Sequence, residues 1–495
     1  MSWLDLVGTR VCVAGIGVAG ASAVRALAAR GVQVVAVDGR DGPAEQQLAQ
    51  GLRGLGAEVR LGAAEELPEG TDLVVTSPGW RPTQPLLAAA ASAGVPVWGD
   101  VELAWRLRRT DAPWLGVTGT NGKTTTVQML ESVLRAAGLR AVAAGNVGLP
   151  VLDAVLAEPA YDVLAVEVSS FQLHWASTVE FRAGAVLNLA PDHLDWHGSM
   201  DAYAEAKASV WRGAGTAVFN ADDPAVAALA AARGGRRVGF TLGDPVDGQL
   251  GVSGTALLDR AYCPAADLRG SALGGPAGVP DASPAAEVRG RALRGGEEAP
   301  AGVVLAEVTD VRPAAPHNVA NALAAAALAR AVGVDPAAVQ DGLRTFAPGG
   351  HRIAHVASVA GVDYVDDSKA TNPHAAAASL RAFDRVVWIA GGLAKGARFE
   401  EVVDGAAGRL RAAVLMGRDR ALVAEALARH APQIPVVEVT GTDTGAMDDV
   451  VRAAAGLAEP GDTVLLAPAC ASMDMFRDYA ARGDAFAEAV RRLGS

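Results

Sequence analysis

Short apolar runs alternate with amphipathic stretches along almost the whole chain. Near the start, an apolar run at residues 11–14 leads into a glycine-rich turn and a helical pattern that ends at Gly31. A second apolar run follows at residues 33–37, and further runs lie at 73–76 and 96–98. A strand, a glycine turn, a helix and a second strand form a βαβ unit, so the pattern predicts a parallel sheet in the N-terminal part.

A second series of the same kind begins at Trp114, after a basic and proline-containing stretch that we interpret as a linker. A short strand is followed by the segment 119–124 and by a helical pattern that stops at Gly138. The run at 161–168 is apolar apart from Tyr161, Asp162 and Glu167, which is typical of a parallel strand buried on both faces.

Regular periodicity fades between about residues 244 and 300. We interpret residues 265–302, which are rich in Gly, Ala, Pro and Arg, as a flexible surface insertion. A helical pattern resumes at 317–331.

A third region begins near Gly349. It carries apolar runs that are each followed by loop residues and an amphipathic stretch, at 386–390, 413–416, 436–439 and 463–467. This alternation favours a doubly wound sheet. We therefore predict an α/β protein of three domains. They are an N-terminal Rossmann-like domain at 1–108, a central P-loop ATPase-type parallel sheet at 109–348 and a C-terminal Rossmann-like domain at 349–495.

Composition narrows the class of protein. A chain of 495 residues suits two to four domains, and 51% apolar residues supply ample material for buried cores. The net charge of −12 argues against broad nucleic-acid binding. No apolar run approaches the roughly 20 residues needed to span a bilayer, and no signal peptide is evident. Three scattered cysteines without a CxxC pair fit a reducing cytoplasm.

Lysine is rare in this chain. Only four of the 43 basic residues are lysines, and the other 39 are arginines. The four are Lys123, Lys207, Lys369 and Lys395, and all lie in the motifs described below. A lysine amine can lose its proton and arginine cannot, so these positions form a short list of amines that guanidinium would not replace.

Two glycine motifs each follow a predicted strand. Gly15, Gly17 and Gly20, with Asp38 eighteen residues further on, match a dinucleotide fingerprint. This motif leaves open a nicotinamide or flavin cofactor, another nucleotide, or a turn that binds nothing. The segment from Gly119 to Thr124 matches a phosphate-binding loop, except that Val stands at position 117 where the strict motif has Gly.

Three polar residues of the central region are candidates for metal or ligand binding. Glu167 ends a buried strand, where a carboxylate is costly unless it is paired or binds a metal. His193 stands between two acids after another strand, and Lys207 lies on the helical segment that follows. A salt bridge for Glu167 and an ordinary solvated lysine at position 207 are the structural alternatives.

The third region has its own candidates. Asn318 and Asn321 share a helix face just before it, although they also suit a capped helix start. Polar residues at 366–372, 391–396 and 468–474 each follow a strand, at the edge where open α/β sheets bind ligands. Cys470 lies in the last of these loops, and a buried inert thiol is the commoner case.

Together these motifs resemble the Mur ligase family of peptidoglycan synthesis. The resemblance covers nearly the whole chain except about 265–302, and it rests on the segments 119–124, 167–173, 192–195, 317–321, 367–372 and 468–474 together with Lys207. The sequences Asp-Ser-Lys-Ala-Thr-Asn and Ala-Cys-Ala-Ser point to the branch that adds D-glutamate.

The resemblance implies an ATP-dependent ligase. It would phosphorylate the L-alanine carboxylate of UDP-N-acetylmuramoyl-L-alanine and let D-glutamate displace the phosphate. The expected cofactors are ATP and two Mg²⁺ ions. We expect a cytoplasmic monomer that acts on small molecules, with no nucleic-acid partner and no membrane insertion.

The resemblance also implies roles for individual residues. Those implied for catalysis are Lys123, Glu167, His193, Lys207 and Lys369. Those implied for ATP are Gly119, Thr120, Asn121, Gly122, Lys123, Thr124, Thr125, Asn318, Asn321, Arg352 and Asp367. Those implied for the UDP substrate are Gly15, Gly17, Val18, Ala19, Asp38, Arg40, Gly79, Asn146, Ser169, Gln172 and His193. Those implied for D-glutamate are Thr371, Lys395, Ser472, Met473 and Tyr479. The implied metal ligands are Thr124, Glu167, His193 and a carbamylated Lys207.

Three rivals remain at this level. The first is a nucleotide-dependent switch or binding protein without ligase chemistry, which makes no use of the polar cluster in the third region. The other two are enzymes. One is a ligase of the same family, or a folylpolyglutamate-synthase-like ligase, that takes a different amino acid. The other is a nicotinamide-dependent oxidoreductase, suggested by the first glycine motif, which leaves the phosphate-binding loop unexplained.

Overall fold

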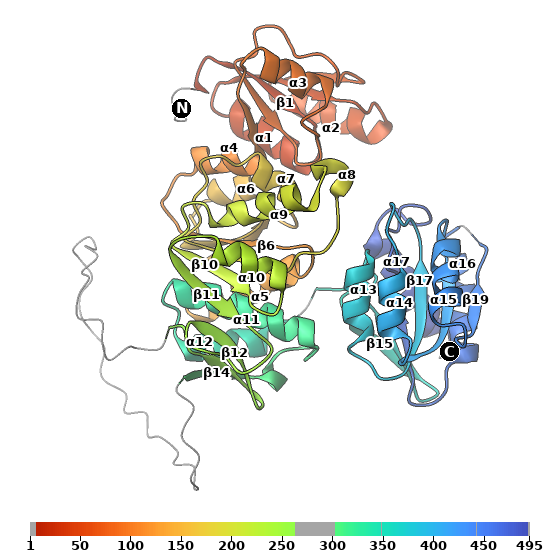
Figure 1. Ribbon diagram of the computed structural model, residues 1–495. Coiled ribbons are helices and arrows are strands. Elements are labelled where there is room, and N and C mark those ends of the chain that lie inside the picture. Colours follow the sequence, from red (N-terminus) through yellow and green to blue (C-terminus); the bar gives the residue numbers. More distant parts are fainter. Residues whose placement is uncertain (1–5, 263–301, 348, 442, 494–495) are drawn as a thin grey trace.

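Three separate sheets organise the chain in the computed structural model, which describes residues 6–262, 302–347, 349–441 and 443–493 (Figure 1). All but the last position of the predicted insertion at 265–302 lies outside the described residues. The three-domain α/β architecture predicted from the sequence is confirmed. No helix in the described part of the chain combines the length and apolar character that crossing a membrane requires.

The N-terminal sheet is parallel throughout, in the order β3-β2-β1-β4-β5. Its strands are β1 (Arg10–Ala14), β2 (Gln33–Asp38), β3 (Glu58–Leu61), β4 (Leu73–Thr76) and β5 (Val97–Gly99). Its helices are α1 (Val18–Ala28), α2 (Pro43–Arg53), α3 (Pro85–Ser92) and α4 (Asp100–Leu107). The chain leaves β1 and β4 toward opposite neighbours, and such a switch point is where open sheets bind ligands.

The central sheet has the order β14-β13-β12-β11-β10-β9-β6-β8-β7. Its parallel strands are β6 (Trp114–Thr118), β7 (Ala141–Gly145), β8 (Val163–Glu167), β9 (Ala183–Val186), β10 (Thr216–Asn220), β11 (Arg236–Phe240) and β12 (Gln249–Ser253). The strands β13 (Ala256–Asp259) and β14 (Val303–Glu307) extend it as an antiparallel edge. The sequence pattern did not predict this edge, because strands β12 and β13 fall where periodicity fades.

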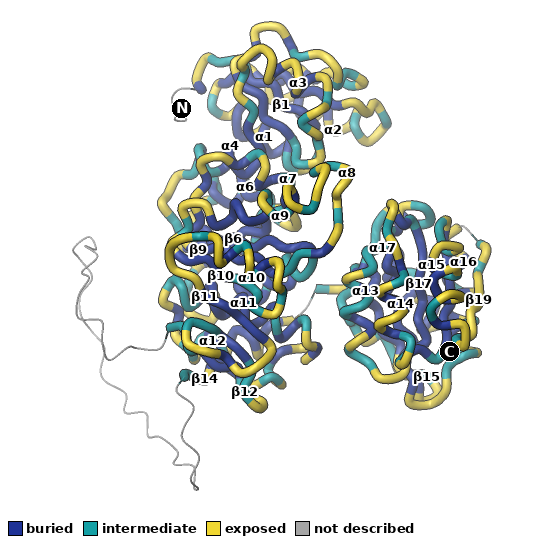
Figure 2. Tube along the Cα trace, viewed as in Figure 1, coloured by how far each residue is buried: buried dark blue, intermediate teal, exposed yellow. Residues whose placement is uncertain are grey.

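Helices cover both faces of the central sheet. The α-helices are α5 (Lys123–Ala136), α6 (Val151–Val155), α7 (Ser170–His174), α8 (Leu194–His197), α9 (Met200–Ala208), α10 (Pro224–Ala231), α11 (Pro316–Ala331) and α12 (Pro336–Thr345). Short 3-10 helices lie at Ser209–Trp211 and Val308–Asp310. Helix α11 is the most deeply buried of these, since an unbroken run from Asn321 to Ala329 is excluded from solvent (Figure 2). Its many alanines allow the close approach of α5 and the sheet.

The C-terminal sheet has the order β15-β16-β20-β17-β18-β19, and only β15 is antiparallel. Its strands are β15 (Ala354–Val359), β16 (Val362–Asp366), β17 (Val386–Gly391), β18 (Leu410–Met416), β19 (Val436–Glu438) and β20 (Thr463–Leu466). Its helices are α13 (Pro373–Leu380), α14 (Glu400–Ala406), α15 (Arg420–His430), α16 (Ala446–Leu457) and α17 (Tyr479–Leu493).

The apolar cores show how the domains are joined. One core runs from the N-terminal sheet into the central domain and includes Val11, Val101, Trp114 and Val151. The two cores of the C-terminal domain, one on each face of its sheet, are built only from residues of that domain. The N-terminal and central domains therefore share buried surface, while the C-terminal domain lies beside them with its own interior (Figure 1).

Candidate active site

The loop between β6 and α5 is built to hold phosphate. Gly119 and Gly122 have φ angles of 152° and 85°, a region that favours glycine. An ideal Cβ on Gly122 would lie 2.4 Å from Oδ1 of Asn321, and one on Gly119 would lie 2.9 Å from Cβ of Leu187. The loop leads into the N-terminus of α5, where free N–H groups favour an anion.

Lys123 is the first residue of α5, and its side chain folds back over the loop. Its Nζ donates to the carbonyl oxygens of Gly119 and Thr120, at 2.9 Å each. Burial lowers the pKa of Lys123, and the nearby carboxylate of Glu167 opposes that shift. A nucleotide phosphate would give this ammonium a stronger acceptor than the two carbonyls.

Glu167 is the last residue of β8 and is 1% exposed. Its Oε1 accepts a hydrogen bond from Nδ2 of Asn146 at 3.0 Å, whereas its buried Oε2 has no partner. An unpartnered buried carboxylate oxygen is costly, and a hard cation would satisfy it. The described residues contain no cluster of three or more His, Cys, Asp or Glu side chains suited to a metal. A Mg²⁺ ion here would therefore need hydroxyl, phosphate or carbamate oxygens as further ligands, and Thr124 at the start of α5 offers such a hydroxyl.

Lys207 is 2% exposed, so the alternative of a solvated surface lysine is wrong. Helix α9 points its side chain under the phosphate-binding loop, where Nζ donates to the carbonyl oxygen of Gly119 at 2.8 Å. The Nζ atom also lies 4.5 Å from the ring centre of Tyr203. Burial, and then the positive field of Lys123, lower the pKa of Lys207 well below its ordinary value. A neutral amine in this position is a nucleophile, which an ordinary ammonium is not.

His193 caps the start of α8 in a left-handed conformation, with φ of 54°. Its Nδ1 lies 3.6 Å from Oδ1 of Asp192, and its ring lies 4.8 Å from that of Phe171. Burial lowers the pKa of His193, and the attraction of Asp192 only partly offsets this. A neutral imidazole keeps the lone pair that a metal or a proton needs.

Lys123, Glu167 and His193 line one cavity of about 320 Å³ between the central and C-terminal domains, whereas Lys207 lies behind the phosphate-binding loop and is not part of the lining. The site residues predicted from the sequence that line it are Thr120, Asn121, Gly122, Lys123, Thr124, Thr125, Asn146, Glu167, His193, Asn318, Asn321, Arg352, Asp367, Lys369 and Thr371. Two domains thus contribute to one hollow, and every predicted ATP residue except Gly119 is on its wall.

Direct hydrogen bonds join the two domains at this cavity. Nδ2 of Asn372 donates to Oδ1 of Asn121 at 3.1 Å, and Nδ2 of Asn121 lies 2.9 Å from Nδ1 of His374. Asn372 also caps helix α13 by accepting from the N–H of Ala375. The phosphate-binding loop is therefore tied to the start of a helix in the C-terminal domain.

The opposite wall is formed by Asp367 and Arg352. Asp367 accepts a hydrogen bond from the hydroxyl of Ser379, and burial raises its pKa to about 6. On the central domain, Asn321 donates to Oδ1 of Asn318 at 3.4 Å, so both amides face the cavity from α11.

Most of the residues implied for D-glutamate lie outside this cavity. Lys369 is on its wall, with Nζ 4.1 Å from the ring centre of Tyr479, and burial lowers the pKa of Lys369 to about 8. Ser472 is buried, Met473 is 59% exposed, and Lys395 is exposed with a φ of 51°. Only Thr371 of the set implied for D-glutamate lines the cavity, so the structure does not bring the set together there.

The residues implied for the UDP substrate lie in three places. Asn146 and His193 line the cavity, while Gly15, Gly17, Val18, Ala19, Asp38, Arg40 and Gly79 lie in the N-terminal domain. Ser169 and Gln172 form a capping box at the start of α7, and Nε2 of Gln172 donates to Oδ2 of Asp100 at 2.9 Å.

The N-terminal glycine turn is tightly packed. An ideal Cβ on Gly20 would lie 1.8 Å from the carbonyl oxygen of Gly15, but one on Gly17 would meet no atom within 4 Å. Asp38 accepts from the N–H of Ile16 at 3.0 Å and from the side chain of Arg40 at 3.1 Å. Burial opposes ionisation, but these hydrogen bonds lower the pKa of Asp38 overall. Open space at Gly17, next to the start of α1, suits a phosphate group.

Comparison with known proteins identifies the family. Family models match three segments, described as the Mur ligase MurD-like N-terminal domain (9–99), the Mur ligase middle domain (117–248) and the Mur ligase glutamate ligase domain (351–470). The chain belongs to the Mur ligase family. The relatives include UDP-N-acetylmuramoylalanine–D-glutamate ligases of Streptomyces coelicolor, 59% identical over 99% of each chain, and of Thermobifida fusca, 57% identical over 99% of this chain and all of the relative.

Solved structures of Mur ligases share the fold at much lower identity. One is a pseudomurein peptide ligase type C from Methanothermus fervidus, with 17% identity and a TM-score of 0.56. The match covers 98% of this chain and all of that structure. UDP-N-acetylmuramate-alanine ligase from Thermotoga maritima gives the same identity, coverage of this chain and TM-score, over 99% of its own length. Membership of a ligase family removes the oxidoreductase that the first glycine motif left open.

Several wall residues of this Mur ligase cavity were not among the predicted site residues. Asp192 and His317 line it, and burial lowers the pKa of His317 to about 4. Asn372, which belongs to the predicted ligand loop 366–372 but was given no role of its own, and Ser379 also line it, from either end of α13. An Asn before Pro373 is a helix-start signal, which could have identified Asn372 from the sequence.

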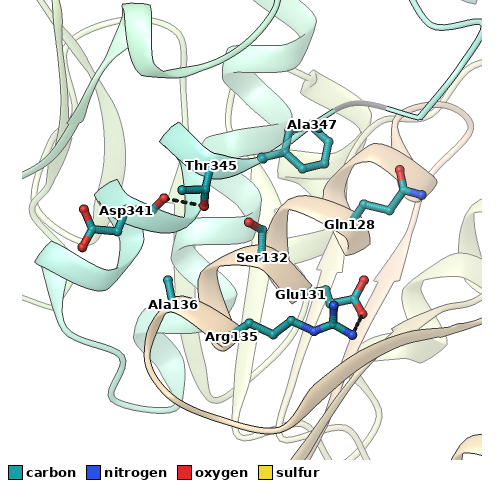
Figure 3. Close-up of a pocket in the computed structure, with 9 residues that line it drawn as sticks. Gln128, Glu131, Ser132, Arg135, Ala136, Asp341, Thr345 and Ala347 are labelled. Carbon is teal, nitrogen blue, oxygen red and sulfur yellow. Dashed lines mark hydrogen bonds and ion pairs between the residues drawn. The ribbon is translucent and has the colours of Figure 1, made fainter.

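A second cavity lies on the other side of α5, against α12 (Figure 3). Gln128, Ser132, Asp341 and Thr345 line it, and Glu131 pairs with Arg135 at its edge. None of the predicted site residues contributes to it.

Proposed function

We propose that this protein joins D-glutamate to the L-alanine carboxyl group of UDP-N-acetylmuramoyl-L-alanine and converts ATP to ADP and phosphate. The observation that carries the proposal is identity of 57–59% to ligases named for this reaction, over nearly the full length of both chains. The cavity supports it, because it combines a phosphate-binding loop with amines and carboxylates of two domains.

The reaction needs an activated acyl group, because a carboxylate does not react with an amine at neutral pH. An oxygen of the L-alanine carboxylate attacks the γ-phosphorus, and the bond from phosphorus to ADP breaks. The amine of D-glutamate then attacks the acyl carbon, and phosphate leaves from a tetrahedral intermediate. Both steps depend on alignment and charge neutralisation more than on covalent help from the protein.

The residues of the cavity divide this work. Lys123 and the loop N–H groups hold the β and γ phosphates. Asn318, Asn321, Arg352 and Asp367 hold the rest of the nucleotide. Glu167 and Thr124 would bind Mg²⁺, which reduces the negative charge between phosphate and the incoming carboxylate.

Lys207 and His193 would serve a second Mg²⁺. The neutral amine of Lys207 attacks carbon dioxide, forms a C–N bond and loses a proton, which leaves an anionic carbamate. Carbamate oxygen is a hard ligand of the kind Mg²⁺ prefers. The unusual burial of Lys207 against Gly119 supports this assignment, because burial lowers the pKa of the amine and places it next to the phosphate-binding loop.

The substrate would reach the cavity from the N-terminal domain. Gly15, Gly17, Val18, Ala19, Asp38, Arg40 and Gly79 would bind its UDP group, and Asn146, Ser169, Gln172 and His193 the muramoyl-alanine arm. Thr371, Lys395, Ser472, Met473 and Tyr479 would form the subsite for D-glutamate after the C-terminal domain moves, with Lys369 beside them. We expect a cytoplasmic monomer.

Phosphate release tests the proposal directly. Purified protein is incubated with ATP, Mg²⁺ and UDP-N-acetylmuramoyl-L-alanine, and then with D-glutamate, L-glutamate, meso-diaminopimelate or L-lysine in separate reactions. We expect release with D-glutamate only, and a product heavier by one glutamyl residue in the mass spectrum. Turnover with another of these amino acids would move the protein to a different branch of the family, and no ATP-dependent product with any of them would refute a ligase.

A further inference from the structure

Arg482 is a buried guanidinium near the start of α17, and it is 1% exposed. Burial lowers its pKa to about 10, so it stays charged at neutral pH. Among the residues that the structure describes, the carboxylates of Asp474 and Asp366 attract the guanidinium, but neither is within ion-pair distance of it. A buried cation without a direct ion-pair partner costs free energy unless its donors are hydrogen-bonded, so its hydrogen bonds matter.

The polar atoms of Arg482 hydrogen-bond to two loops and lie beside a third. Nε donates to the hydroxyl of Ser368 at 2.9 Å, and Nη2 donates to the carbonyl oxygen of the same residue at 2.9 Å. Nη1 donates to the carbonyl oxygen of Cys470 at 3.1 Å. An ideal Cβ on Gly392 would lie 3.3 Å from Nη1, so the loop after β17 also packs against the guanidinium.

These three loops leave the carboxyl ends of β16, β20 and β17, which are neighbours in the C-terminal sheet. Further bonds tie them to one another. Ser368 donates from its hydroxyl to the carbonyl oxygen of Tyr479 at 2.8 Å. The N–H of Leu393 donates to the carbonyl oxygen of Ala471 at 2.8 Å, and the reverse bond is 3.0 Å long. The side chain of Arg482 thus lies where the loops after β16, β20 and β17 meet.

The same loops carry the residues proposed for D-glutamate. Lys369 follows Ser368 directly, Ser472 follows Cys470 by two positions, and Lys395 follows Gly392 by three. The guanidinium therefore hydrogen-bonds to the backbone next to Lys369 and two positions before Ser472, and it lies beside the loop that carries Lys395, although it does not itself line the cavity.

We propose that Arg482 is a positioning residue that holds these three loops in register and so determines the affinity of the subsite for the incoming amino acid. This inference rests on the function proposed above. Arginine suits the role because its planar group presents five donors in a fixed arrangement and stays charged when buried. Lysine would keep the charge but has one nitrogen, which cannot reach acceptors on two loops from two directions.

The test compares Arg482→Lys with the wild type in three saturation series, for D-glutamate, ATP and UDP-N-acetylmuramoyl-L-alanine. We expect the KM for D-glutamate to rise by about tenfold, because two or more net hydrogen bonds are lost, with the other two KM values within about twofold. A simple loss of stability would lower the fraction of active protein and kcat, but it would not raise one KM alone.

Arg411→Lys provides a matched control. Arg411 lies in the same domain at the opposite, amino end of β18, where it pairs with Glu459 at 3.0 Å and with Asp462. Its replacement should leave all three KM values unchanged. Equal changes in all three values for Arg482→Lys, or no change in the value for D-glutamate, would overturn the inference.

A second variant covers the case in which Arg482→Lys does not fold. Ser368→Ala removes one acceptor of the guanidinium and the bond to Tyr479, and it should raise the KM for D-glutamate by about threefold. An unchanged value in a folded Ser368→Ala protein refutes the inference while the proposed function stands. If the wild type turns over with a different amino acid, the proposed substrate is wrong, and the same comparison made with that amino acid tests Arg482.

Discussion

The amine of Lys207 donates a hydrogen bond to the carbonyl oxygen of Gly119, the first glycine of the phosphate-binding loop. Lys207 is nearly excluded from solvent and lies in the positive field of Lys123, an unusual environment for a lysine side chain. Its lowered pKa makes the free amine available for reaction with carbon dioxide.

Replacement of Lys207 by arginine should reduce kcat by at least about a hundredfold, because arginine keeps a positive charge and cannot be carbamylated. The measurement is ATP-dependent phosphate release, with circular dichroism to confirm folding. In the wild type, removal of dissolved carbon dioxide should lower activity and bicarbonate should restore it. Full activity of Lys207→Arg would exclude the carbamate.

Gly122→Ala should abolish ATP binding, because the added Cβ on the phosphate-binding loop would lie 2.4 Å from Oδ1 of Asn321 on α11. Gly138→Ala is the matched control. Gly138 has a similar φ of 79°, against 85° for Gly122, but nothing lies within 4 Å of its ideal Cβ. Both variants carry the same backbone strain, so calorimetric titration with ATP should separate them. Equal loss of affinity in both would mean that strain, and not the contact with Asn321, decides binding.

His374→Phe should weaken the contact between the C-terminal domain and the phosphate-binding loop. Neutral His374 can accept from Nδ2 of Asn121, and its pKa is lowered because burial, followed by Arg381, disfavours the charged ring. One lost hydrogen bond corresponds to about 1 kcal/mol, or a fivefold shift in the balance between contact and separation. Small-angle scattering should show a larger radius of gyration for the variant. The same radius for variant and wild type would show that this bond does not hold the domains together.

Asp100→Asn should stabilise the protein above about pH 6, relative to its effect at acidic pH. Burial raises the pKa of Asp100 to about 6, and its Oδ1 has no hydrogen-bond partner. The folded state therefore binds the proton more tightly than the unfolded state, whose carboxyl has an ordinary pKa near 3.8. The stability that this proton provides is present below about pH 3.8 and is lost as the pH rises through 6, for a total of up to about 3 kcal/mol.

The side-chain amide of the Asp100→Asn variant would not ionise, so in urea unfolding the variant should gain on the wild type as the pH rises from about 4 to 6 and then keep a constant advantage. Asp111→Asn, at an exposed position, should show no such trend. A constant difference between Asp100→Asn and the wild type from about pH 4 to 6 would contradict the shifted pKa.

Much of the fold and of the nucleotide site could be predicted from the sequence. The strand at 73–76 lies where its apolar run predicts it, and the residues of the phosphate-binding loop meet Glu167 because parallel strands place their carboxyl ends at one edge. The antiparallel strand β13 was missed, because its short apolar run lies between glycines and prolines without alternation. The burial of Lys207 was also missed, since a helical pattern does not show which face packs against the phosphate-binding loop of the same domain.

The subsite for D-glutamate marks a different limit. Loop positions after β17 and β20 follow from the sequence, but the orientation of one domain against another does not. Lys395 and Met473 therefore lie away from the cavity in this structure. The role proposed for Arg482 could not be predicted from the sequence either, because no motif distinguishes it from the other arginines among the 39 in the chain.

The distribution of apolar cores decides where this chain can be divided. The interior around Val11 and Trp114 belongs to two domains at once, so a fragment ending at residue 108 would expose part of it to water. The two cores around Trp388 and Phe486 are complete within the third domain. If the chain is expressed as two polypeptides divided near Gly349, each should fold and the two should then associate. The third domain would therefore be an exchangeable part, and the first two domains a single folding unit.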